Sequence, residues 1–128
     1  MEWVVIVMML ALIEFIVLAT RVGLARGRTG VVAPAVTGNE EFERHFRVHY
    51  NTLEQLILFI PGIWFFAAYV HELGAAAVGA VFLVGRALYA VSYVKDPTSR
   101  GIGMLLSIVP CYILVIGALG GAIWSLMS

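Results

Sequence analysis

The sequence has little charge. Only 12% of its 128 residues are Asp, Glu, Lys or Arg, whereas 62% are hydrophobic. A soluble domain of this length needs far more polar surface, so the composition excludes a soluble globular protein and indicates an integral membrane protein. Too little polar sequence remains for an extramembrane domain. We therefore expect a single membrane domain over residues 1–128.

Cysteine is also scarce. Cys111 is the only one, so an intrachain disulfide is excluded. It lies inside an apolar stretch, and we predict that it is a small packing residue. We assign neither a metal site nor a nucleic-acid partner to this chain.

Long apolar runs make up most of the sequence. Four of them meet the requirement of about 20 residues for a helix that crosses a ~30 Å hydrocarbon core. We place the membrane spans at about residues 3–20, 47–70, 75–94 and 103–127. The predicted fold class is therefore all-α, an integral membrane bundle of four transmembrane helices.

The cationic residues indicate the orientation of these helices. Seven cations lie in or beside the first and third connections: Arg21, Arg26, Arg28, Arg44, Arg47, Lys95 and Arg100. The second connection, His71-Glu72, has none. By the positive-inside rule, the first and third connections face the cytoplasm. So many cations on one side also suggest an anionic ligand there.

The first connection should be the only sizeable loop. We expect it over residues 21–39, because glycines and Pro34 interrupt this stretch. Thr37-Gly38-Asn39-Glu40 fits a capping box, which predicts that the second helix starts near residue 40. A helix from there to about residue 70 is roughly 46 Å long, longer than the hydrocarbon core. Its first turns should therefore stand at the cytoplasmic membrane boundary.

A polar face marks the start of this second helix. Arg44, Arg47, Asn51 and Glu54 project within about 80° of each other at 100° per residue. Ionisable groups at membrane depth are costly and indicate a functional site.

The third span carries a second polar set. Arg86, Tyr89 and Tyr93 are spaced by three and four residues, so they share one helix face. Arg86 lies deep enough to need a carboxylate partner or a wet cavity, and Glu54 lies at a similar depth on the adjacent helix. We expect these two residues to pair. Such a pair could belong to a site, or it could only orient two helices.

Together these motifs resemble a known family. The string Phe42-Glu43-Arg44-x-x-Arg47-x-x-x-Asn51-x-x-Glu54 is similar to the signature of the membrane-associated proteins in eicosanoid and glutathione metabolism (MAPEG). The resemblance continues through Arg86-x-x-Tyr89-x-x-x-Tyr93 to Arg100, at the spacing of the cysteinyl-leukotriene synthase and microsomal glutathione transferase branch. Arg26 falls in register as well, and the match covers nearly the whole chain.

The resemblance implies a homotrimer of four-helix subunits that bind glutathione between neighbours at the cytoplasmic boundary. Five residues would line the site of one subunit, with Arg86 in the same polar set: Arg47, Asn51, Glu54, Tyr89 and Tyr93. Arg26 and His49 would approach from the next subunit, and Arg100 would lie against the thiol as the catalytic residue. His49 lies about 140° from Arg44 on the helix, so it could face a neighbour.

The chemistry of glutathione gives an independent reason for this set. Its two carboxylates suit arginines, and its ammonium suits a glutamate. Tyrosine hydroxyls and an asparagine amide can satisfy its peptide groups. Its thiol needs a neighbouring cation, because the thiolate is the nucleophile and a free thiol has a pKa of about 8.5.

The sequence also departs from the family pattern. His49 replaces a usual Gln, Gln55 replaces a common Tyr, and Gly27 replaces a second Arg, for which Arg28 could substitute. These changes affect the neighbour-side contacts and the electrophile pocket more than the glutathione core. Glu14, inside the first span, has no family role, and we expect it to face the bundle.

The leading functional hypothesis is a glutathione-dependent membrane transferase, with or without peroxidase activity, that acts on lipophilic electrophiles from the bilayer. The alternative is a non-catalytic lipid-binding or scaffold protein like the lipoxygenase-activating branch, which lacks part of the Arg/Glu set. A small transporter built around Arg86 and Glu54 fits poorly, because there are no inverted repeats. A single Lys and short loops favour a bacterial inner membrane over an endoplasmic reticulum-type membrane.

Overall fold

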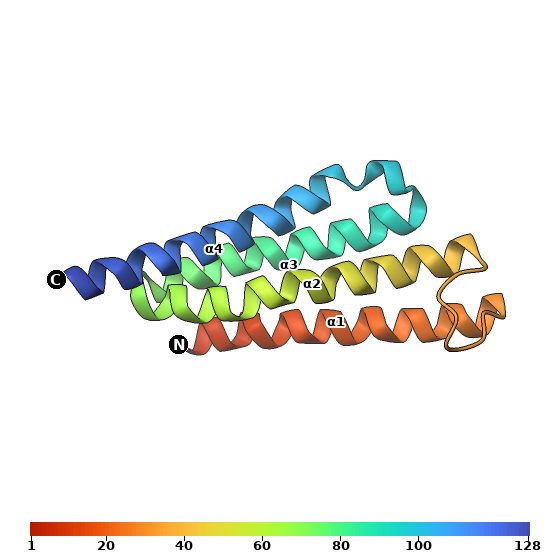
Figure 1. The fold of residues 1–128 in the computed structure, drawn as a ribbon, viewed down its shortest axis with the longest axis horizontal. Helices are drawn as coiled ribbons and strands as arrows, with labels where there is room; N and C mark the ends of the chain where they lie inside the picture. The colour runs from red at the N-terminus through yellow and green to blue at the C-terminus, as the bar shows by residue number, and fades with distance from the viewer.

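The computed structural model describes residues 1–128 as a bundle of four helices (Figure 1). The helices are α1 (Glu2–Thr29), α2 (Glu40–Tyr69), α3 (Glu72–Lys95) and α4 (Gly101–Met127), and the short 3₁₀ helix η1 (Pro97–Ser99) joins α3 to α4. Each of the four is long and apolar enough to cross a membrane. The predicted all-α class is therefore confirmed.

The first helix is longer than the sequence suggested. The prediction of a loop over residues 21–39 is wrong for its first nine residues, because α1 continues to Thr29. Glycine inside a helix costs only about 1 kcal/mol, so Gly23 and Gly27 do not end it. Gly30 does: it adopts the left-handed conformation (φ 76°), and its N–H binds the carbonyl of Arg26. Arg21, Arg26 and Arg28 consequently lie on a helix surface.

The second helix begins at Glu40, as predicted, but with a different cap. The side chain of Asn39, not that of Thr37, accepts the N–H of Phe42 at 3.1 Å. The Glu43 carboxylate accepts the N–H of Gly38 at 3.2 Å. Asn39 is therefore the residue that satisfies a free N–H of the first turn.

The bundle core is apolar and lies between all four helices. Each of α2 and α3 packs against the other three helices. The rings of Phe59 and Phe82 stack at 4.0 Å between centroids, and Cys111 is fully buried in the same cluster, as predicted for a packing residue. On α4, a Cβ at Gly103 would lie 2.4 Å from the backbone nitrogen of Tyr89. Glycine there lets α4 approach α3 closely beside the predicted site.

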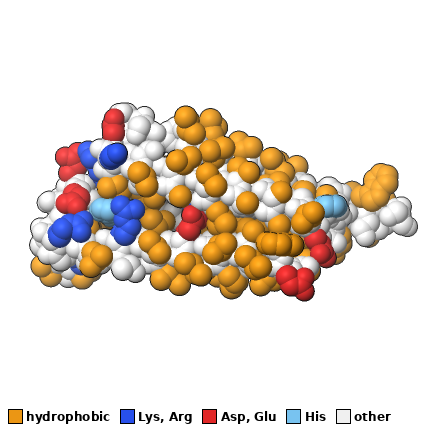
Figure 2. Space-filling model, turned by 180° about the vertical axis from the view of Figure 1, so that it is seen from behind, with side chains coloured by type: hydrophobic (Ala, Val, Ile, Leu, Met, Phe, Trp, Pro, Cys, Tyr) orange, Lys and Arg blue, Asp and Glu red, His pale blue; other side chains and the backbone are white.

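Cationic side chains gather at one end of the bundle. Both termini and the α2–α3 turn lie at one end, and the 30–39 loop and the α3–α4 connection lie at the other (Figure 1). Lysine and arginine side chains cluster at that second end, whereas the middle of the molecule is mostly apolar (Figure 2). We call this second end the charged end.

Candidate functional site

The structure builds the site around Arg86, which is only 1% exposed. Its Nε donates to the Ser107 hydroxyl at 2.9 Å. Its Nη1 donates to Asn51 Oδ1 at 2.8 Å and to Thr52 Oγ1 at 3.1 Å. The guanidinium also lies 4.4 Å from the centroid of the Tyr89 ring. One buried cation thus joins α2, α3 and α4 with charge-assisted hydrogen bonds.

The expected pair between Arg86 and Glu54 is wrong. Glu54 is exposed on α2, and it forms no hydrogen bond or ion pair within the chain. Asn51, one turn earlier, points to Arg86 instead, with Thr52 beside it. The rotation of α2 against α3 decides which of these side chains enters the core, and sequence spacing does not report that rotation. Glu54 is consequently left with a free carboxylate.

Arg86 also fixes the orientation of the Asn51 amide. An arginine can only donate hydrogen bonds, so the Asn51 group that faces Nη1 must be its carbonyl oxygen. The amide NH₂ then points away from Arg86. Since Asn51 is half-buried, that donor can serve a ligand on the exposed face of α2. Arg86 itself acts through Asn51, because its own side chain is enclosed.

Two tyrosines of α3 continue this polar region toward the charged end. Tyr89 is buried, and its ring stacks on that of Tyr93 with centroids 5.5 Å apart. Arg47 and Arg100 lie close enough to act electrostatically on the Tyr89 hydroxyl. The structure therefore brings Arg47, Asn51, Tyr89, Tyr93 and Arg100 into one region.

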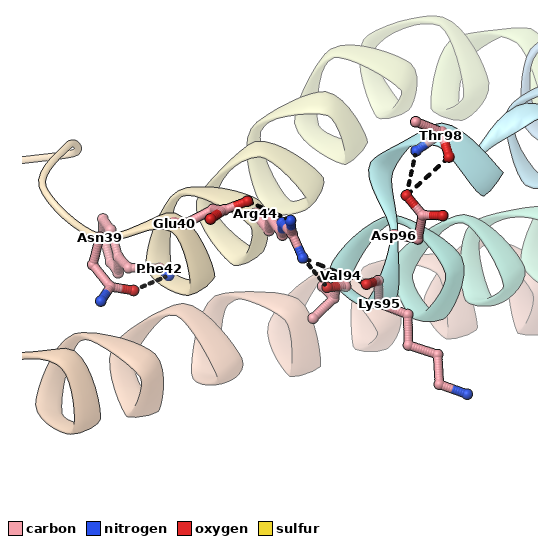
Figure 3. A network of polar contacts seen from close by, with 8 residues as sticks. All are labelled: Asn39, Glu40, Phe42, Arg44, Val94, Lys95, Asp96 and Thr98. Carbon is pink, nitrogen blue, oxygen red and sulfur yellow. Dashed lines mark hydrogen bonds and ion pairs between the residues drawn. The ribbon is translucent and has the colours of Figure 1, made fainter.

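The short α3–α4 connection presents Arg100. The Asp96 carboxylate accepts the N–H and the hydroxyl of Thr98 at 3.1 and 2.9 Å, as drawn in Figure 3. These hydrogen bonds lower the pKa of Asp96. The Ser99 hydroxyl donates to the carbonyl of Ser92 at 3.1 Å. Arg100 follows as the exposed N-cap of α4, and a weak contact of 3.4 Å to the carbonyl of Pro97 leaves its guanidinium available.

Arg44 has a structural contact that separates it from the rest of the polar face of α2. Its Nη1 donates to the carbonyls of Val94 and Lys95 at 3.2 and 3.4 Å, and its Nη2 donates to Glu40 at 2.5 Å (Figure 3). The last carbonyls of a helix have no partner within it. Arg44 therefore caps α3 from α2 and holds the α3–α4 connection in place.

Arg26 and His49 lie apart from this region within a single chain. Arg26 donates to the carbonyl of Ala35 at 2.7 Å, and its guanidinium lies 4.6 Å from the centroid of the Phe42 ring. His49 stacks on Phe15 of α1 with centroids 4.5 Å apart. Nearby, Arg28 donates to Glu41 at 2.5 Å, which lowers the pKa of that carboxyl. The Arg26 contact holds the 30–39 loop against α1, and the other two contacts join α1 to α2.

Three residues of this region were not predicted as part of it. Thr52 and Ser107 complete the hydrogen bonds of Arg86, and the available signal was a hydroxyl within an otherwise apolar span. Glu14 of α1 is near enough to Arg86 to interact electrostatically, although the two form no ion pair. It faces the bundle, as expected, but no pattern in the sequence indicated which helix it would face.

The open part of the site has a definite chemical character. Arg47 and Arg100 offer exposed cations, Glu54 offers an exposed carboxylate, and Asn51 offers an amide donor. Such a set can bind a small zwitterion that carries more than one carboxylate.

Comparison with known proteins identifies the family of this chain. The family model described as "MAPEG family" matches residues 4–120. The chain belongs to the MAPEG family. The MAPEG match includes all of α2 and α3, most of α1 and α4, and every residue of the region around Arg86.

Several curated MAPEG relatives are similar over most of the chain. An uncharacterized protein of Synechocystis is 48% identical over 97% of this chain and 90% of its own length. Human microsomal glutathione S-transferase 2 is 38% identical over 80% of this chain and 70% of its own length. Leukotriene C4 synthase of Cavia porcellus is 37% identical over 59% of this chain and 51% of its own length. With four helices able to span a membrane, this MAPEG chain is an integral membrane protein.

Proposed function

We propose that this protein is a membrane glutathione transferase that joins the glutathione thiolate to lipophilic electrophiles. The observation that carries the proposal is one face of α2, with Arg47 and Glu54 exposed and Asn51 half-buried, beside Tyr89 and Arg100. Relatives named as glutathione S-transferase and leukotriene C4 synthase support the same chemistry.

Each side chain has a role in this proposal. Arg47 pairs with a glutathione carboxylate, Glu54 with its ammonium, and the Asn51 NH₂ with an oxygen of the peptide. Tyr89 and Tyr93 line the site, and Arg86 holds Asn51 in the required orientation. Arg100 lies against the sulfur and favours the thiolate once the thiol proton has passed to solvent. The thiolate then forms a C–S bond to an electrophilic carbon, and the bond from that carbon to its leaving group breaks, with the electron pair leaving on that group.

We further propose that the site is completed in a homotrimer. Arg26 and His49 do not reach the Arg47 face within one chain, so they would contribute to the site of a neighbouring subunit. The charged end would then lie on the cytoplasmic side of a bacterial inner membrane, or of an endoplasmic reticulum-type membrane if the source is eukaryotic. The electrophile would reach the site from the bilayer. Peroxidase activity toward lipid hydroperoxides is a compatible side reaction.

The test is glutathione binding by the purified, detergent-solubilised protein. Glutathione should raise the melting temperature in a dose-dependent way, because it binds only the folded state. Arg47→Ala should remove most of that shift, since a hydrogen bond to a charged group contributes about 1.5–3 kcal/mol. S-methylglutathione should still stabilise the wild type, because only its thiol is blocked.

Two results would contradict the proposal. The absence of any shift with either compound at millimolar concentration would exclude glutathione as the ligand. Binding without turnover of electrophiles or hydroperoxides would favour the non-catalytic, lipid-binding alternative.

A further inference from the structure

A cleft lies between two helices of the bundle, apart from the exposed face of α2. It has a volume of about 390 Å³ and runs between α1 and α3. Eight of its eleven lining residues are hydrophobic, and the other three are Glu14, Arg21 and Arg86. Apart from Arg86, none of the lining residues belongs to the proposed glutathione site.

Two polar atoms on residues that line this cleft have no hydrogen-bond partner. Glu14 Oε1 and Arg86 Nη2 are both buried, and neither forms a hydrogen bond. Every other nitrogen of Arg86 is bonded, to Ser107, Asn51 and Thr52. Arg86 is 1% exposed and lines the cleft, so a molecule seated in the cleft is the nearest source of a partner for Nη2 that the structure offers. A buried polar group without a partner is costly, and more so when it is charged.

The two groups do not satisfy each other. No nitrogen of Arg86 comes within 4.0 Å of a Glu14 oxygen, although the side chains interact electrostatically. A group placed between them must accept a hydrogen bond from Nη2 and donate one to Oε1. A hydroxyl does both.

The surroundings specify the rest of the ligand. Glu14 and Arg86 both lie about midway along their spans, far from either end of the bundle. Leu10, Ile13 and Val17 of α1 and Leu83, Ala87 and Val91 of α3 form an apolar wall on either side. We propose that the α1–α3 cleft binds an uncharged lipid through a hydroxyl group on an apolar chain, held between Glu14 and Arg86. This site is independent of the proposed transferase activity.

The experiment uses photolabelling of the full chain in lipid nanodiscs. The probe is a twelve-carbon primary alcohol with a diazirine midway along its chain, and its matched control is the diazirine hydrocarbon without the hydroxyl. We expect the alcohol to label residues 10–18 and 83–91 at least fivefold more than the hydrocarbon does. Dodecan-1-ol should compete, whereas dodecane and dodecanoic acid should compete at least tenfold more weakly.

Three variants sharpen the result. Glu14→Leu should reduce the labelling by about tenfold, because the acceptor is lost. Glu14→Gln keeps an acceptor oxygen of the same shape and should retain most of it. Ala87→Phe fills the cleft from an exposed position, so it should block the labelling even if Glu14→Leu fails to fold.

Several outcomes would overturn the proposal. Equal labelling by alcohol and hydrocarbon would mean that the cleft is only an apolar surface. Unchanged labelling in Glu14→Leu or in Ala87→Phe would place the alcohol elsewhere. Stronger competition by dodecanoic acid than by dodecan-1-ol would assign the site to a carboxyl group instead of a hydroxyl.

Discussion

Arg86 organises the site from inside the bundle. It contacts two helices besides its own, and it forms three hydrogen bonds while being almost fully enclosed. Its effect on a ligand is indirect, through the orientation of Asn51. That indirect role can be tested because the two ends of the Asn51 amide have different partners.

The substitution Asn51→Asp separates the two functions of this amide. The aspartate retains an oxygen for Arg86 Nη1 but cannot donate to a ligand. We expect the melting temperature without ligand to change little and the glutathione affinity to fall at least tenfold. Asn51→Ala is the control, and it should lose both stability and affinity. Unchanged affinity in Asn51→Asp would show that the amide does not contact glutathione.

Arg100 should matter for the sulfur more than for binding. Arg100→Ala should abolish the ultraviolet thiolate absorbance of bound glutathione at pH 7 and change its affinity less than tenfold. Ionisation alone gives little net rate, because a less basic thiolate is a poorer nucleophile. The turnover loss should therefore exceed about threefold, since Arg100 also positions the sulfur. Full turnover with an unchanged thiolate signal would remove Arg100 from the mechanism.

At the scale of elements, the ends of the helices position the exposed residues. Arg44 binds the last carbonyls of α3, and Asp96 and Ser99 fix the connection that precedes Arg100. The approach of α4 to α3 depends on Gly103, which has no room for a Cβ against Tyr89. These contacts fix the positions of the side chains that the charged end exposes.

The capping of α3 by Arg44 can be measured as stability. Arg44→Ala should lower the free energy of unfolding by about 1–2 kcal/mol, because two carbonyls lose their donor. Glu40→Ala is the matched control: it removes the exposed i,i+4 pair with Arg44, worth about 0.3–0.5 kcal/mol, and one of three acidic side chains in the first turn of α2, but neither carbonyl contact. Thermal unfolding in detergent compares the two. Equal losses would show that the carbonyl contacts contribute nothing.

At the scale of the whole molecule, the division of the site between subunits is the main question. Arg26 and Arg47 lie on different helices and do not contact each other within one chain. A closed cyclic oligomer would bring the Arg26 of one subunit to the Arg47 of the next.

Mixed oligomers test this division. Arg26→Ala and Arg47→Ala subunits, each inactive alone, should regain about a quarter of wild-type activity when mixed equally, because random assembly leaves that share of interfaces intact. The control mixes Arg47→Ala with Glu54→Ala. Both changes affect the same side of an interface, so no activity should return. Failure of the first mixture would place the whole site within one subunit.

Several features of this protein could be predicted from its sequence. Apolar runs of about 20 residues determine membrane spans because the bilayer thickness is fixed. The grouping of Arg47, Asn51 and Glu54, and of Tyr89 with Tyr93, follows from the period of the α-helix. The MAPEG resemblance rested on these same residues, and the family match confirms it.

Other features depended on the tertiary structure. Helical periodicity places residues on a face, but the rotation and depth of one helix against another come from side-chain packing over the whole interface. Because of that packing, Arg86 forms hydrogen bonds with Asn51, Thr52 and Ser107 and no ion pair with Glu54. The same packing places Glu14 of α1 in the cleft beside Arg86. The end of α1 at Gly30 was likewise decided by backbone conformation, because glycine is compatible with both a helix and its termination.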